Sequence, residues 1–257
     1  MRTLSNCVEL IFHKAYAELR AEATRAYLGF MWWFVEPFLY MAVFYVIFES
    51  GLKRGGAGFV PFLLCGLVTW KWFASTVNAA SGVLGGNATI MQQVYLPKVI
   101  FPLVLVVVNT FKFGVALGFL LLFLILNPDI TVSASWLALP VLIAMQLLLI
   151  ASITILVAAV VPFLPDLKLL LDNALMLMFF LSGVFYKFHE MSPEMQRLLR
   201  FNPMLLLIEA YRVALLNNSQ PNWKPLLGVT GVSIIFLCGG VMLFNRYDRV
   251  YPKIVIR

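Results

Sequence analysis

Charged residues, cysteines and histidines are all scarce in this sequence. Of its 257 residues, 12% are charged and 62% are hydrophobic, whereas a soluble domain carries roughly 25% charged residues. A soluble protein of this composition would have too few polar side chains to cover its surface. The composition therefore predicts a membrane protein. No long polar stretch could fold separately, so we expect a single transmembrane domain over residues 1–257.

The motifs of common catalytic centres are missing. The sequence contains no Gly-x-x-x-x-Gly-Lys-Ser/Thr, no His-Glu-x-x-His and no Gly-x-Ser-x-Gly pattern. His13 and His189 are far apart, and Cys7, Cys65 and Cys238 show no Cys-x-x-Cys spacing. We expect no metal, no cofactor and no catalytic residue in this chain. Cys65 and Cys238 lie in apolar runs and are expected to be small buried hydrophobic residues.

The net charge of +7 comes from basic residues that lie mainly between apolar runs. A nucleic-acid-binding protein gathers such residues on one surface instead, so nucleic acid is a poor candidate partner. The first 30 residues contain three glutamates and no uninterrupted apolar core, and therefore do not resemble a cleavable signal peptide.

Six apolar runs predict an all-α protein that crosses the bilayer six times. A membrane helix needs roughly 20 apolar residues, and the longest run exceeds this length. The runs are Met31–Phe48, Phe59–Ala80, Val99–Leu126, Trp136–Val161, Leu169–Tyr186 and Leu226–Phe244.

The distribution of Lys and Arg predicts that both chain ends lie in the cytoplasm, because cytoplasmic segments carry an excess of these residues. The first 30 residues and the tail after Phe244 hold four each. The connection between the fifth and sixth runs also holds five, which fits if it folds as a structure of its own outside the membrane.

The N-terminal segment over residues 3–27 predicts an amphipathic helix. Apolar residues recur in steps of three or four, with charged residues largely on the other faces. Such a helix either lies in the membrane interface or packs on a partner protein.

The connection between the second and third runs predicts a short helix. Asn87 is a suitable N-cap, and residues 88–96 would form two turns that stop at Pro97. On the cytoplasmic face, this helix is either a docking element for a soluble partner or a simple structured loop.

The connection over residues 187–225 contains an apolar, helix-patterned segment, Met204–Leu216, which is too short to cross. This pattern indicates a re-entrant or interfacial helix.

Four charged residues within or next to the apolar runs are candidates for a function. Glu36 and Glu49 lie near opposite ends of the first run, whereas Lys71 and Lys112 lie deeper in the second and third. Charges inside a membrane are costly, so each lysine either lines a polar route or forms an interhelical ion pair or snorkels. The many aromatic residues either contact lipid or line a passage in which sugar rings could stack.

Several stretches resemble one family, the membrane subunits of bacterial ABC exporters of polysaccharides such as O-antigen and capsule. Similar motifs are Tyr27-Leu28-Gly29 with Trp32, Trp33 and Glu36-Pro37; Phe62–Trp70 with Trp72-Phe73; Asn87 with Val94–Lys98; Phe180–Tyr186; and Asn202-Pro203 with Glu209–Arg212. They follow the family order over nearly the whole chain. Relatives often have a neutral residue at the position of Glu36.

The resemblance implies a homodimer that pairs with two copies of a separate cytoplasmic ATPase, where ATP and Mg²⁺ would bind. It also implies roles for individual residues. Residues 1–30 would form the cytoplasmic amphipathic helix, 84–98 the coupling helix and 188–222 the periplasmic gate helices. Coupling residues would be Asn87, Ile90, Gln93, Val94, Tyr95, Leu96, Pro97 and Lys98. The lipid-linked glycan would be engaged near Leu28, Gly29, Trp32 and Trp33. Channel and gate residues would be Phe180, Phe185, Tyr186, Asn202, Pro203, Glu209, Tyr211 and Arg212.

The resulting hypothesis is a permease in the bacterial inner membrane that exports lipid-linked polysaccharide and hydrolyses nothing itself. An ABC exporter of another lipid or a drug, and a non-transport subunit of polymer assembly, are the alternatives. A secondary transporter is disfavoured, because acidic residues are missing from the middle of the runs.

Overall fold

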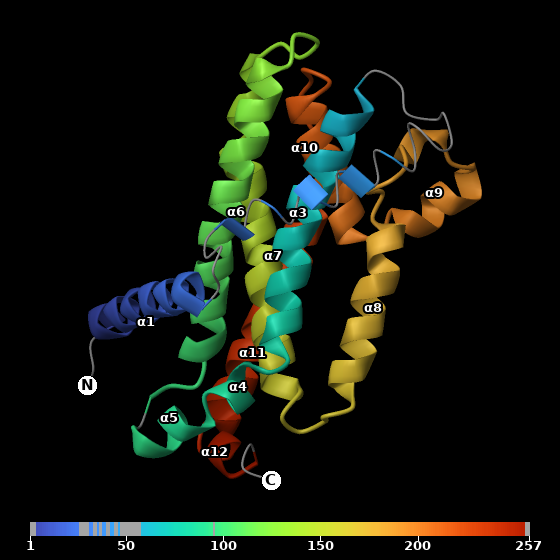
Figure 1. Cartoon of the computed structure of the whole chain (residues 1–257). Helices are drawn as coiled ribbons and strands as arrows, with labels where there is room; N and C mark the ends of the chain where they lie inside the picture. Colours follow the sequence, from blue (N-terminus) through green and yellow to red (C-terminus); the bar gives the residue numbers. More distant parts are fainter. Residues whose placement is uncertain are drawn as a thin grey trace.

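The computed structural model describes residues 4–25, 58–94 and 96–254, together with residues 31, 32, 35, 38, 39, 42, 43 and 46. Four long helices form its body (Figure 1): α3 (Phe59–Ala80), α6 (Ile100–Leu126), α7 (Leu139–Val160) and α11 (Trp223–Tyr247). A 3-10 turn over Ala134–Ala138 leads into α7. Helix α7 packs along α11, and α3 packs against α6 and α7.

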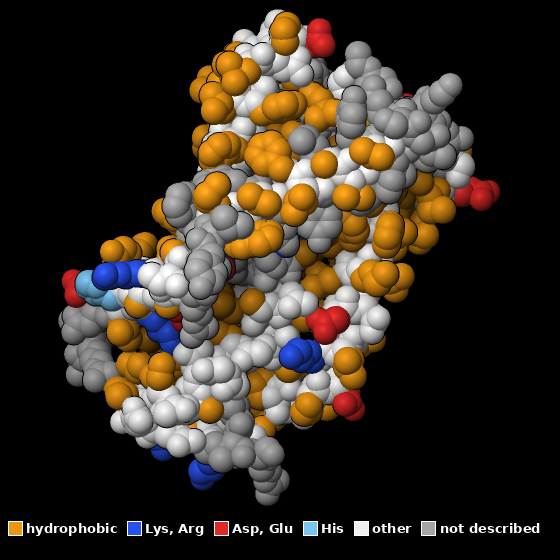
Figure 2. All heavy atoms as spheres, in the orientation of Figure 1, with side chains coloured by type: hydrophobic (Ala, Val, Ile, Leu, Met, Phe, Trp, Pro, Cys, Tyr) orange, Lys and Arg blue, Asp and Glu red, His pale blue; other side chains and the backbone are white. Residues whose placement is uncertain are grey.

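Within the described part of the chain, these four segments are long and apolar enough to cross a membrane. No strand occurs in that part. The chain is thus an all-α, multi-pass membrane protein. The face drawn in Figure 2 is largely covered by hydrophobic side chains in its upper part, whereas charged side chains gather on α1, toward the lower end and at the edge.

The predicted spans compare as follows with the helices. The second run matches α3 at both ends, the third begins one residue before α6, and the sixth is extended at both ends in α11. The fourth run corresponds to the 3-10 turn and α7. The first run lies mostly outside the described residues. The fifth appears as α8 (Leu167–Leu181), whose 15 residues cover roughly 22 Å at 1.5 Å per residue. Six crossings therefore stay a prediction.

Close packing of the long helices depends on a small residue. The Cα of Gly240 on α11 lies so near α7 that an added Cβ would stand 2.9 Å from Cγ2 of Ile155. Inside the bundle, polar side chains bond to backbone: Gln146 on α7 donates to the carbonyl of Thr69 on α3 at 2.9 Å. Such contacts satisfy polar groups that have no access to water.

The short helices lie at two opposite ends of the bundle (Figure 1). Helices α4 (Val83–Gly86), α5 (Ala88–Gln93) and α12 (Tyr251–Ile254) lie where α6 begins and α11 finishes; we call this the α5 end. The opposite end, which we call the α10 end, carries the turn over residues 127–133 and the last turns of α10 (Pro203–Leu215).

Two further elements stand outside the bundle. Helix α9 (Pro193–Leu199) projects beyond the top of α8, and α1 (Leu4–Arg25) packs on the lower part of α6 and extends to the left of it (Figure 1). The prediction of an N-terminal helix and of a short helix within residues 187–225 is confirmed. Of the cysteines, Cys65 is buried as expected, but Cys238 is exposed on α11, so its predicted burial was wrong.

Candidate functional site

The segment predicted to couple to a partner forms two short helices rather than one. Helix α4 stops at Gly86, α5 follows from Ala88, and the chain becomes extended at Val94. The predicted helix over residues 88–96 is therefore shorter than expected. Pro97 accounts for part of this difference, because the residue before a proline avoids the helical conformation.

Helix α5 presents apolar side chains outward. Met91 is buried and fixes the helix to the bundle, whereas Ile90 and Val94 are 41% and 45% exposed. Gln93 and Pro97 are exposed as well, Leu96 is half-buried, and Tyr95 lies outside the described residues. An exposed apolar pair on and directly after a short anchored helix is suited to contact with another protein.

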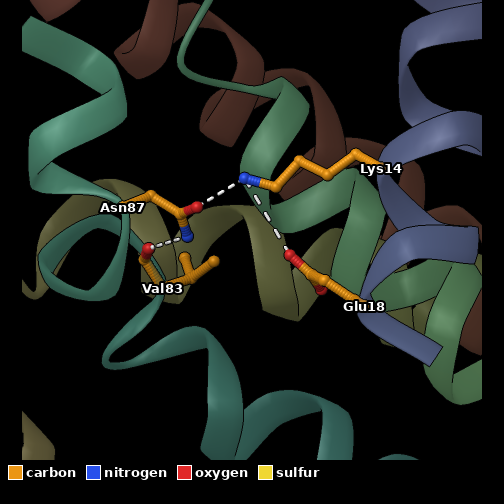
Figure 3. Close-up of polar contacts among 4 residues, drawn as sticks. All are labelled: Lys14, Glu18, Val83 and Asn87. Carbon is orange, nitrogen blue, oxygen red and sulfur yellow. Dashed lines mark hydrogen bonds and ion pairs between the residues drawn. The ribbon is translucent and has the colours of Figure 1, made fainter. Parts of the chain in front are cut away.

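Asn87 occupies the N-cap position of α5, but its side chain makes no capping bond. Its Nδ2 donates instead to the carbonyl of Val83 at 2.8 Å, and its Oδ1 accepts a hydrogen bond from Nζ of Lys14 (Figure 3). The predicted N-cap position is therefore confirmed, but the side chain does not cap the helix. Asn87 joins the junction of α4 and α5 to helix α1.

Lys14 is the centre of this junction. Its Nζ lies 3.9 Å from Oε1 of Glu18 (Figure 3) and 4.4 Å from the ring centroid of Phe101. Partial burial lowers the pKa of Lys14, an effect that Glu18 opposes. Burial also raises the pKa of Glu18, against the charges of Lys14 and Lys112. The Lys14 ammonium is thus partly desolvated, and its polar partners offset part of the cost of that desolvation.

Helix α1 is attached to α6 along an apolar strip and by one ion pair. Ala15 is buried in a cluster with Ile100, Val104 and Val108 of α6. Beyond this strip, Nζ of Lys112 lies 2.7 Å from Oε1 of Glu22. The ion-pair alternative for Lys112 is therefore confirmed.

A second apolar strip of α1, with Phe12 and Tyr16, remains exposed. One apolar face of α1 thus packs against α6, and a second apolar face is exposed.

The C-terminal helices fix the other side of the α5 segment. Lys98 is only 2% exposed; its Nζ lies 3.7 Å from Oδ2 of Asp248, and its backbone N–H donates to Oδ1 at 3.0 Å. Helix α12 contacts α5. The hydroxyl of Tyr251 on α12 donates to the carbonyl of Ala159 at 3.1 Å. The segment is therefore tied to α1 on one side and to α7 and α11 on the other.

The residues predicted for a channel and gate lie away from the α5 end. Asn202 accepts bonds from the backbone N–H groups of Met204 and Leu205, and thus caps α10, while its Nδ2 donates to the carbonyl of Leu181. Pro203 is the first residue of α10. The cap joins α10 to the end of α8.

Arg212 of α10 is almost fully buried, at 3% exposure. Its guanidinium donates to the carbonyls of Phe62 at 3.2 Å, Gly183 at 2.6 Å and Val184 at 2.9 Å. It also lies 3.4 Å from the ring centroid of Phe62. A Cβ on Gly66 would stand 2.6 Å from Nη2. The glycine therefore leaves the space that the guanidinium occupies.

The other predicted gate residues differ in how deeply they are buried. Tyr211 is buried, Glu209 is half-buried and Phe180 is exposed on α8. The ring of Phe185 packs at 4.9 Å from Phe179 and 6.0 Å from Phe180. Phe185 and Tyr186 also line a cavity of about 760 Å³ at the α10 end.

Of the residues predicted to engage the glycan, Leu28, Gly29 and Trp33 lie outside the described residues, as do Glu36 and Glu49. Trp32 is described and borders a cavity with Lys71 and Lys112. A second cavity, of about 490 Å³, lies between α3 and α8 and is also lined by Lys71. No cluster that could hold a metal ion occurs among the described residues.

The sequence signature of the ABC-2 type transporter family matches residues 13–216. The chain belongs to this family. It is 27% identical over 248 residues to the O-antigen export system permease protein RfbA of Myxococcus xanthus, covering 95% of this chain and 94% of that protein. It is 23% identical over 239 residues to RfbA of Klebsiella pneumoniae, covering 93% and 92%.

Membership of the ABC-2 type transporter family makes the chain a transport subunit. The structure brings the described coupling residues together at the α5 end, and most of the predicted gate residues around α10. Sequence reasoning missed Lys14, Asp248 and Gly66 as partners of those residues. The spacing of Lys14 and Glu18 suggests a pair along one helix, but no sequence pattern indicates that Lys14 reaches Asn87.

Proposed function

We propose that this chain is the permease of an ATP-driven exporter that moves lipid-linked polysaccharide across the bacterial inner membrane. The exposed Ile90 of α5 and Val94 directly after it, in a segment anchored from both sides, carry the coupling part of the proposal. The names of the similar RfbA proteins, which cover almost the full length, support the substrate class.

In this proposal, two copies of the chain assemble with two cytoplasmic ATPase subunits. The α5 end faces the cytoplasm, so both chain ends lie there, and ATP and Mg²⁺ bind only to the ATPases. Closure of the ATPases pushes on α5. Because Asn87 contacts Lys14, and Lys98 contacts Asp248, that displacement reaches α1 and α11 together. Short helices at the α10 end, within residues 188–222, then open the periplasmic exit.

The first test is co-purification of the full chain with its cognate ATPase, followed by measurement of ATPase stimulation. We expect a stable complex, and we expect Ile90→Asp to abolish stimulation because it places a charge in an apolar contact. Val132 is an exposed hydrophobic residue at the α10 end. The variant Val132→Asp is therefore the matched control. The coupling proposal is wrong if no complex forms, or if both variants behave alike.

The substrate requires a separate test. Deletion of the gene should remove long surface polysaccharide and leave lipid-linked glycan inside the cell. An intact surface polysaccharide together with a functional ATPase complex would point to an exporter of another lipid or a drug. An intact polysaccharide without any ATPase complex would point to a non-transport role.

A further inference from the structure

The connection between α7 and α8 exposes apolar side chains at the α5 end of the bundle (Figure 1). It runs over residues 161–166, and Leu164 and Phe163 within it are 58% and 38% exposed. Asp166 and Lys168, which follow them in the sequence, are exposed as well. The apolar pair therefore lies where the apolar surface of the bundle gives way to charged residues.

Backbone hydrogen bonds hold this α7–α8 connection in one shape. The N–H groups of Phe163 and Leu164 donate to the carbonyls of Val160 and Val161 at 3.0 Å and 3.1 Å. The N–H of Leu167 donates to the carbonyl of Leu164 at 3.0 Å. Two prolines within the connection restrict its backbone further. A preformed segment loses little conformational entropy on binding, so its exposed side chains suit a docking surface.

Phe163 is anchored on one side and exposed on the other. Its ring meets the rings of Tyr247 and Tyr251 at steep angles, with centroids 5.2 Å and 5.4 Å apart. Tyr251 is itself buried, and its hydroxyl donates to the carbonyl of Ala159 at 3.1 Å. An aromatic side chain that is held in place and still exposed is suited to contribute much of the energy of a protein contact.

Helix α12 links the α7–α8 connection to the α5 segment. Tyr251 begins α12 and contacts Phe163, and α12 also contacts α5. Val250, directly before α12, is exposed as well. The exposed apolar residues of the connection are therefore joined through α12 to Ile90 and Val94, the contact already proposed for the ATPase.

The charges around the connection indicate the chemistry of a partner. Within the described residues 161–168 and 245–254, Asp166 is the exposed carboxylate, and the partly exposed Asp248 is paired with Lys98. The exposed cations in these two segments are Lys168, Arg246, Arg249 and Lys253. An apolar centre with a basic rim is complementary to a protein surface with an apolar pocket and an acidic rim.

We propose that the α7–α8 connection, together with α12, is a second docking surface for the cytoplasmic ATPase, beside α5. This proposal rests on the proposed function, which places the α5 end in the cytoplasm and the ATPase on α5. The fixed backbone of the connection and its link to α5 favour a protein over a lipid surface, because lipids adapt equally well to a mobile segment.

The second contact acts on different helices from the first. Displacement of α5 reaches α11 through Lys98 and Asp248, whereas the connection joins α7 directly to α8. Residues 183–184 follow the end of α8, and their carbonyls accept hydrogen bonds from Arg212 of α10. A push on the connection is therefore transmitted along α8 to the α10 end.

Photo-crosslinking in the complex of the full chain with its ATPase tests the contact directly. Benzoylphenylalanine replaces Leu164, and in separate samples Ile90 or Val132. We expect ATPase adducts from the first two positions and none from Val132, which lies at the α10 end. An adduct from Ile90 without one from Leu164 overturns the inference and leaves the proposed function intact. A lipid adduct from Leu164 in its place identifies the membrane as the occupant. No ATPase adduct from either position contradicts both.

The affinity of the ATPase for the permease measures the weight of the contact. We expect Leu164→Asp to weaken it about tenfold, because the new carboxylate would enter an apolar contact. Lys168→Glu, at the rim, should weaken it about two- to threefold, and this effect should disappear at high salt. Val132→Asp should leave the affinity unchanged.

The inference is overturned if Leu164→Asp and Val132→Asp bind the ATPase equally well while Ile90→Asp still abolishes stimulation. If Leu164→Asp does not fold, Leu164→Ser replaces it and should weaken binding in the same direction by a smaller factor. Equal affinity of Leu164→Ser and the unmodified chain would then overturn the inference.

Discussion

Helices α5 and α10 are both short elements attached to long apolar helices, yet different kinds of side chain hold them. The α5 segment is tied by ionic and polar contacts, between Lys14 and Asn87 and between Lys98 and Asp248. Helix α10 is tied by the buried Arg212, whose guanidinium bonds three backbone carbonyls. The contacts of Lys14 are partly solvated and can re-form in a new position at low cost, whereas the buried donors of Arg212 cannot be released without leaving carbonyls unpaired. Lys98 is buried as well, but its partner Asp248 is partly exposed.

The difference indicates which end can follow a partner. Ile90 and Val94 are exposed, and polar contacts hold the α5 segment to its neighbours. The α5 segment can therefore move as one unit with a partner protein bound to it. The α10 attachment is rigid at Arg212, so any opening there has to carry α10 and residues 183–184 together. The following four predictions test this contrast, in order of decreasing effect on stability.

The largest loss should come from Arg212→Leu. The carbonyls of Gly183 and Val184 would lose donors in an interior without water, so we expect a loss of about 3 kcal/mol or more in the free energy of unfolding. Thermal unfolding of the purified chain measures it. Arg200→Leu, at an exposed position, is the control, and an equal effect of the two variants would show that the α10 end does not depend on these bonds.

Gly66→Ala should have the next largest effect. The new Cβ would stand 2.6 Å from Nη2 of Arg212 and would push the guanidinium from its carbonyls. We expect a loss of about 1–3 kcal/mol, typical of overpacking. Gly114→Ala on α6 meets open space and serves as the matched control. Equal unfolding temperatures for the two variants would contradict the close fit.

Lys98 and Asp248 should show a moderate interaction. A double-mutant cycle with Lys98→Met and Asp248→Asn should give a coupling energy of about 1 kcal/mol, because one partner is buried and the other partly solvated. The same cycle for Lys187 and Glu190, which are both well exposed, should give a value near zero. The interpretation fails if the two pairs cannot be distinguished.

Lys14→Gln should change stability least, by less than about 1 kcal/mol, since its contacts are partly solvated. It should nevertheless reduce ATPase stimulation, because α1 would no longer follow the junction of α4 and α5. A comparison of stimulation with unfolding temperature separates these effects. Full stimulation in Lys14→Gln would show that α1 does not take part in coupling.

The spans were the most predictable part of the fold. Composition determines that a run such as Phe59–Ala80 is buried in lipid or protein, and α3 has those same bounds. The short α10 was also predictable, because its apolar pattern follows Asn202 and Pro203, which favour a helix start. Both signals are local, so no tertiary information was needed.

The partners of charged side chains were not predictable. Lys112 was recognised as costly, but its pairing with Glu22 depends on where α1 crosses α6, a matter of tertiary packing. Likewise Asn87 suits an N-cap by residue type, yet Lys14 and the carbonyl of Val83 compete successfully for its amide. The burial of Arg212 depends on the absence of a side chain at Gly66, which is distant in the sequence.

Helix α8 has a consequence for the surrounding bilayer. Its 15 residues reach roughly 22 Å, about 8 Å less than a hydrocarbon core of roughly 30 Å. Leu169, Leu177 and Phe180 along it are exposed. If α8 crosses the bilayer as the sequence predicts, the lipids beside it have to shorten or tilt, a hydrophobic mismatch that thins the membrane locally. A crossing α8 therefore predicts that transport falls as the acyl chains of the surrounding lipids lengthen.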